Sequence, residues 1–126
     1  MTTFFGAVLC LQLLSCAAAP VKYSDGYQES KNSAGVYTVR FTGNGHTSPE
    51  AVEKALERRC AELTLREGYD WFTFYTKSRN DHVGMRQKSV PSFYGVIHMH
   101  RGPVGEDGFD AKKIVAEPMP AWIESD

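Results

Sequence analysis

Two histidines stand two residues apart in the segment Ser92 to Arg101, SFYGVIHMHR, and they are the side chains best placed to bind a metal ion. In an extended strand, His98 and His100 share one face and lie about 7 Å apart, because side chains alternate between faces. Imidazole nitrogens bind Zn²⁺ and Cu²⁺, and both ions need further ligands. His46 and His82 are candidates, although no spacing selects them. The pair therefore indicates a metal or small-ligand site, or two surface histidines on a half-buried strand.

Other reactive groups carry weaker chemical signals. The stretch GNGHTS, which begins at Gly43, lacks the third glycine of a dinucleotide fingerprint and the Gly-Lys-Thr of a P-loop, so we interpret it as a turn before a helix. Cys60 falls on an apolar helical stripe, where a thiol is shielded rather than activated. No Ser-His-Asp order, paired carboxylate or glycine elbow stands out. We therefore predict no catalytic residue, no enzymatic activity and no cofactor.

The N-terminal segment predicts a covalent modification at Cys16. The apolar run from Phe4 to Leu14 is too short to span a bilayer and has the length of a signal-peptide core, although no Lys or Arg precedes it. Leu13-Leu14-Ser15-Cys16 resembles a bacterial lipobox. The resemblance implies cleavage between Ser15 and Cys16, diacylglycerol on the Cys16 thiol, and an acyl chain such as palmitate on the new amino terminus, which together hold a protein on a membrane. The alternatives are an ordinary secretory signal cut near residues 17–19 and a buried N-terminal helix.

Composition limits the partners that the chain can bind. The 126 residues fit one domain, and 42% hydrophobic with 23% charged residues is typical of a folded protein rather than a disordered one. Fourteen basic and fifteen acidic side chains give a net charge of -1, which argues against a nucleic-acid partner and against attachment to a membrane by charge. Membrane attachment therefore depends on the lipid. We predict a signal peptide at residues 1–15, a lipidated tether at 16–32 and one globular domain at 33–126.

Three segments have the alternating pattern of half-buried strands, with aromatic and β-branched residues on one side. They are Val36–Thr42, Asp70–Lys77 and Ser92–Arg101. In the last two, Trp71, Tyr75 and Tyr94 fall on faces opposite the most apolar positions. Strand aromatics usually form the core or pair across strands. The alternative is that these three form an exposed surface for a partner.

Helical signals separate the first two strands. Thr47 with Glu50 fits a capping box, and Ser48 followed by Pro49 fits a cap before a first-turn proline, so either pair predicts a helix start here. Gly68 is typical of a helix end. The apolar stripe between them comprises Val52, Leu56, Cys60 and Leu63. The segment 110–117 indicates a short helix capped by Asp110, or else an edge strand. We predict an α+β fold of two layers, in which one long helix covers a sheet of about three strands in β-α-β-β order, with a short C-terminal helix as an option.

The segments VRFTGNGHTSPE (Val39 to Glu50) and AELTLREGYDWF (Ala61 to Phe72) resemble a family of small proteobacterial lipoproteins of uncharacterised function. The resemblance implies a lipid anchor and a periplasm-facing place in the cell envelope, and Ala17 after the cysteine favours the outer membrane over the inner one. It implies no activity. We therefore expect a non-enzymatic envelope lipoprotein that binds another protein or the cell wall. The alternative function is metal or small-ligand binding through His98 and His100.

Overall fold

The computed structural model describes residues 21–22, 26–44, 47–83, 89–119 and 123–124. The predicted signal peptide, its cleavage site after Ser15 and the predicted lipid attachment at Cys16 lie outside these residues. His46 also lies outside them, and so do residues 16–20 and 23–25 of the predicted tether.

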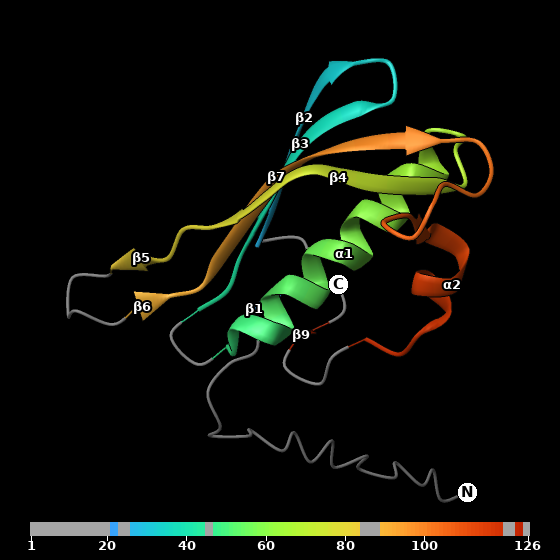
Figure 1. Cartoon of the computed structure of the whole chain (residues 1–126). Coiled ribbons are helices and arrows are strands. Elements are labelled where there is room, and N and C mark those ends of the chain that lie inside the picture. Colours follow the sequence, from blue (N-terminus) through green and yellow to red (C-terminus); the bar gives the residue numbers. More distant parts are fainter. Residues whose placement is uncertain (1–20, 23–25, 45–46, 84–88, 120–122, 125–126) are drawn as a thin grey trace, which may run out of the picture.

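A five-stranded antiparallel sheet forms one layer of the molecule (Figure 1). Its strands follow the order β2 (Tyr27–Ser33), β3 (Val36–Thr42), β7 (Ser92–His100), β4 (Trp71–Arg79) and β8 (Phe109–Asp110). Strands β3 and β4 each pair antiparallel with β7, so they run parallel to one another with β7 between them. Two short pairs lie outside this sheet: β1 (Val21–Lys22) with β9 (Ile123–Glu124), and β5 (His82–Val83) with β6 (Ser89–Val90).

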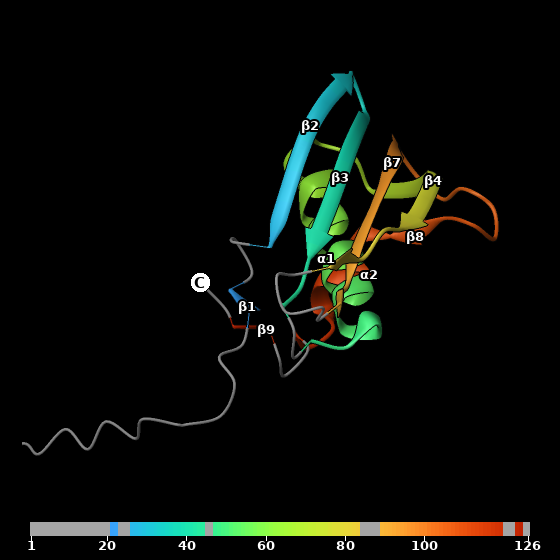
Figure 2. The ribbon, with the colours of Figure 1, turned by 90° about the vertical axis from the view of Figure 1, so that its left-hand side faces the viewer.

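Two helices form the second layer, and both lie on the same side of the sheet (Figures 1 and 2). Helix α1 (Pro49–Arg66) starts as predicted, because the Ser48 side chain accepts a hydrogen bond from the Ala51 amide at 3.2 Å. It ends before Gly68, which has the positive φ of 84° that a left-handed cap requires. Helix α2 (Ala111–Ala116) confirms the predicted short helix. Among the described residues, no helix combines the length and apolar character needed to cross a membrane.

The hydrophobic core lies between α1 and the sheet. The alternation predicted for residues 36–42 is confirmed, because every second side chain of β3 is buried, and β7 behaves in the same way. The core side chains with no more than 2% exposure include Val39, Phe41, Val52, Leu56, Cys60, Leu63, Phe72 and Ile97. The stripe predicted on the helix is therefore the stripe that packs against the sheet.

The predicted sheet was wrong in its size and strand order. The structure has five antiparallel strands rather than about three in β-α-β-β order, and two helices rather than one cover them. The missing strands are at the two edges. Strand β2 has the sequence YQESKNS and is exposed at every position after Tyr27, so it lacks the alternation that marks a half-buried strand. It occupies residues 27–32 of the segment that we predicted as a tether.

A β-bulge in β4 changes which side chains face the helices. The register is regular up to Phe74 opposite Ile97 and resumes at Thr76 opposite Val96, so Tyr75 is the extra residue. Beyond the bulge, the residues that face the helices are Lys77 and Arg79. Lys77 Nζ accordingly lies 3.4 Å from Glu53 Oε2 on α1.

Candidate functional site

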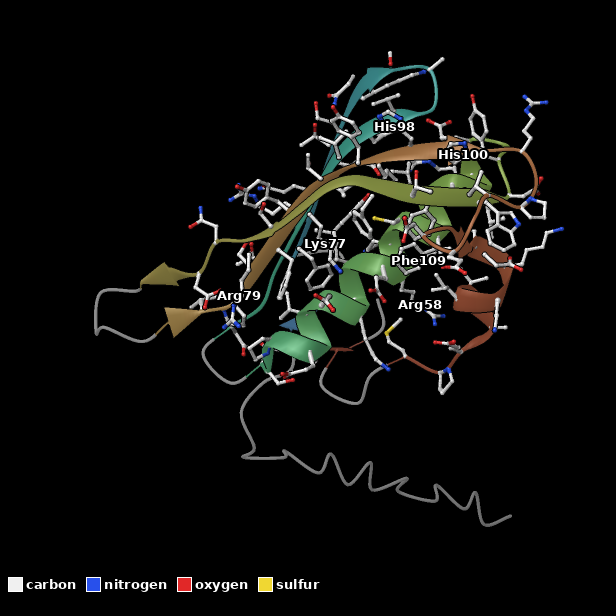
Figure 3. All side chains as sticks on the ribbon, viewed as in Figure 1. Arg58, Lys77, Arg79, His98, His100 and Phe109 are labelled. Atoms are coloured by element: carbon white, nitrogen blue, oxygen red, sulfur yellow. The ribbon has the colours of Figure 1, made fainter. Side chains whose placement is uncertain are left out.

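The side of the sheet opposite α1 and α2 carries most of the candidate residues that the sequence indicated, and we call it the open sheet face. Figure 3 shows His98 and His100 on this side of β7, with Lys77 and Phe109 on the other. The face is defined by residues that alternate with the buried ones: Thr38 and Arg40 of β3, Thr73, Tyr75 and Thr76 of β4, and Tyr94, Val96, His98 and His100 of β7.

Tyr75 is the most prominent side chain of the open sheet face. It is 73% exposed, and it is the large hydrophobic side chain that stands out to solvent in the described part of the chain. Its ring stacks on the His98 imidazole, with 5.2 Å between the ring centroids and 12° between the planes. Alternation places Tyr75 on this side, because Phe74 before it packs on the core, and the bulge puts Thr76 on the same side as Tyr75. A stacked pair of rings presents a flat surface on which another molecule can pack.

Other members of the open sheet face are held by neighbouring strands. The Arg40 guanidinium lies 5.2 Å from the centre of the Tyr94 ring, and the two residues are direct cross-strand partners. His100 Nε2 lies 3.1 Å from Thr73 Oγ1 on β4. These contacts reduce the conformational freedom that a partner would have to restrict on binding.

The two histidines share a face, as their spacing predicts, but their rings already have neighbours. His98 stacks on Tyr75, and His100 is hydrogen-bonded to Thr73. Nowhere in the described ranges do three or more His, Cys, Asp or Glu side chains gather into a group that could hold a metal ion. A metal on this pair would need further ligands from outside those ranges or from another molecule. Metal binding here stays a prediction.

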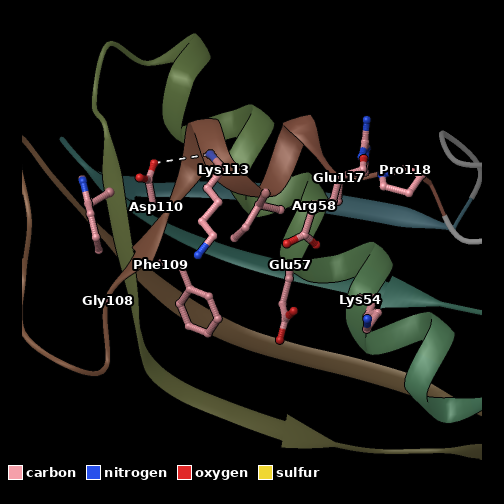
Figure 4. Close-up of a pocket in the computed structure, with 11 residues that line it drawn as sticks. Lys54, Glu57, Arg58, Gly108, Phe109, Asp110, Lys113, Glu117 and Pro118 are labelled. Carbon is pink, nitrogen blue, oxygen red and sulfur yellow. Dashed lines mark hydrogen bonds between the residues drawn. The ribbon is translucent and has the colours of Figure 1, made fainter.

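Trp71 was predicted to share a surface with Tyr75 and Tyr94; in the structure it pairs with His100 at the end of the open sheet face and also borders a cavity. It begins β4, is half-buried, and lines a cavity of about 470 Å³ between α1, α2 and β8. The cavity wall also includes Lys54, Glu57 and Arg58 of α1, Phe109 and Asp110 of β8, and Lys113, Ile114 and Glu117 on or beside α2 (Figure 4). No local sequence pattern predicts this cavity, because its wall joins residues that are far apart in the chain.

The cavity combines an apolar floor with charged walls. The Phe109 ring is stacked on Phe72, with centroids 5.0 Å apart and planes 9° apart, so it is fixed in position. Arg58 reaches from α1 to the end of α2, where its guanidinium donates to the Glu117 carbonyl at 2.5 Å. Burial raises the pKa of the Glu57 carboxyl. Lys77, whose Nζ lies 3.9 Å from Glu57 Oε1, lowers the same pKa to a smaller extent.

Cys60 is a core residue, as its place on the helical stripe predicts. Its side chain is fully buried, and burial raises the pKa of the thiol well above its ordinary value. A thiol in this environment stays protonated and is a poor nucleophile.

No protein-family model, curated protein or solved structure matches this chain. The resemblance to small lipoproteins therefore stays a prediction that rests on the quoted segments.

Proposed function

We propose that this chain is a non-enzymatic lipoprotein of the bacterial cell envelope, held on the membrane by a lipid on Cys16, which binds another envelope protein through its open sheet face. The observation that carries the binding role is the stacked pair of Tyr75 and His98 on a face that neither α1 nor α2 covers.

Chain length supports a partner close to the membrane. Strand β2 begins at Tyr27, so the segment from residue 16 to residue 27 spans at most about 40 Å even when it is fully extended. A lipid on Cys16 would therefore keep the sheet within that distance of the membrane surface. A protein in or on the same membrane lies within reach of such a domain, and for this reason we favour a protein over the cell wall as the occupant.

The chemistry of the open sheet face supports a protein partner as well. Protein interfaces are enriched in tyrosine and arginine, and hot spots cluster around such side chains. Here Arg40 lies over Tyr94 on the same face as Tyr75. Two cross-strand contacts hold the face in shape, so binding does not require a rearrangement of the strands.

In-cell photo-crosslinking tests this proposal. A photoreactive amino acid at position 75 is expected to give one discrete crosslinked protein, and the same group at Lys112, which is exposed on α2, is expected to give none. Arg40→Glu should abolish the product at position 75, because it places a negative charge beside Tyr94. Equal capture at positions 75 and 112, or capture at 75 that Arg40→Glu leaves unchanged, would refute the open sheet face as the interface. Capture of cell-wall fragments alone would identify the other occupant.

A further inference from the structure

The cavity between α1, α2 and β8 has the features of a binding site for a small molecule. Its volume of about 470 Å³ is within the range of small-ligand pockets. Such pockets combine apolar walls with a few polar groups that fix the orientation of the ligand. Here Phe109, Ile114 and Trp71 supply apolar surface, and lysines from two different helices supply charge.

Two of the cationic groups at the cavity lie beyond ion-pair distance of any carboxylate in the part of the chain that the structure describes, although Lys54 interacts electrostatically with Glu57. Lys54 of α1 and Lys113 of α2 form no ion pair there, and neither ammonium group makes a hydrogen bond. Figure 4 shows the Lys113 side chain running from α2 towards the Phe109 ring. The third cation, Arg58, is occupied by the carbonyl of Glu117.

Among the described residues, the three acidic groups at the cavity equal its three cations in number, but each has a different setting. The Asp110 carboxylate caps α2 by accepting a hydrogen bond from the Lys113 amide at 3.4 Å. Glu57 lies near Lys77 and also interacts electrostatically with Lys54, while burial raises its pKa. Glu117 is exposed, as Lys54 and Lys113 are. Lys54 and Lys113 are therefore the cations of the wall that a ligand can still pair with, because neither is within ion-pair distance of a carboxylate in the described residues.

We propose that this cavity binds a small organic anion with an apolar body, such as an aromatic carboxylate. The apolar body would lie against Phe109 and Ile114, and the carboxylate would accept hydrogen bonds from Lys54 and Lys113. Hydrogen bonds between an ammonium and a carboxylate are stronger than neutral ones. This site is separate from the open sheet face, so its test does not depend on the proposed partner.

Calorimetry with three probes of similar shape tests the proposal. Phenylacetate carries a negative charge, phenethylamine a positive one, and benzyl alcohol none. A ligand of this size is expected to bind with a Kd of about 1 mM when the site fits it. We expect saturable binding of phenylacetate, weaker binding of benzyl alcohol and no binding of phenethylamine.

Matched lysine variants then locate the anion. Lys54→Gln and Lys113→Gln should each weaken phenylacetate binding by about fivefold to tenfold. Lys112→Gln is the control, because Lys112 is an exposed lysine of the same helix that does not line the cavity. Circular dichroism should show that all three variants are folded. The proposal is overturned if phenylacetate does not bind, if phenethylamine binds as well as phenylacetate, or if Lys112→Gln weakens binding as much as Lys113→Gln.

Discussion

Replacing Gly95 by alanine is expected to destabilise the sheet at the β4 bulge around Tyr75. Gly95 lies near the middle of β7 and faces the helices, opposite Lys77. A Cβ atom at this position would lie 2.2 Å from the Thr76 carbonyl oxygen and 3.2 Å from the Lys77 Cα atom. These are backbone atoms of the neighbouring strand, so they cannot move aside as the end of a flexible side chain can.

The cost follows from the movement that the methyl group requires. A carbon and an oxygen atom in contact need about 1 Å more than the space available here, and strand β4 would have to shift at its bulge. Overpacking of this kind costs about 1–3 kcal/mol, and we expect the upper end because the obstacle is backbone. The free energy of unfolding of a typical domain is about 5–15 kcal/mol, so the loss is readily measured.

Urea unfolding followed by circular dichroism measures this loss, and two other glycines calibrate it. Gly105 faces open space and has no positive φ, so Gly105→Ala should change the free energy of unfolding by less than about 0.5 kcal/mol. Gly68 also faces open space but has a φ of 84°, so Gly68→Ala should cost about 1 kcal/mol. A Gly95→Ala protein that is as stable as the Gly105→Ala protein would refute the close approach at the bulge.

Three further predictions concern titratable and metal-binding side chains. Cys60 should react with a thiol reagent such as dithionitrobenzoate only after unfolding, because it is fully buried and burial raises its pKa; rapid reaction of the native protein would contradict this burial. Glu57→Gln should raise the free energy of unfolding at pH 7 by about 0.5 kcal/mol, because a raised pKa means that the ionised carboxylate opposes folding and the site is partly solvated. This gain should vanish below about pH 3, where Glu57 is protonated in both states, and a gain that persists there would disprove its electrostatic origin. If the histidine pair binds zinc or copper with a further ligand, either metal should raise the melting temperature, and the rise should be lost in the His98→Ala/His100→Ala variant. A melting temperature that neither metal changes would contradict the metal site.

The central elements of the fold were predictable because their sequence patterns follow their burial. Strand β3 alternates, since one side packs on α1, and the α1 boundaries carry the signals of Ser48 and Gly68. Strand β2 gives no such signal, because it lies at the edge of the sheet and is polar on both sides. Its pairing with β3 depends on the tight turn at Gly35, which has a φ of 71°.

The candidate sites were predictable only in part, for a similar reason. Alternation places His98 and His100 on one face correctly, and it places Tyr75 beside His98. After Tyr75, the side chains of β4 exchange faces of the sheet because of the bulge. Gly95, which lies opposite Lys77, was the one sequence feature that could have indicated this bulge. Lys54 and Lys113 line the same cavity although they are far apart in the sequence. No local sequence pattern could predict that they lie close together in space.

The proposal depends most of all on the lipid at Cys16, so acylation is the most direct measurement. Cells that express the protein would be fed an alkyne-bearing fatty acid, and label on the wild type would be compared with label on Cys16→Ala and on Cys60→Ala. We predict that the wild type and Cys60→Ala are labelled and that Cys16→Ala is not, because Cys60 is buried in the core. An exported wild-type protein without label, or label that persists in Cys16→Ala, would contradict the lipid anchor and the place at the membrane that depends on it.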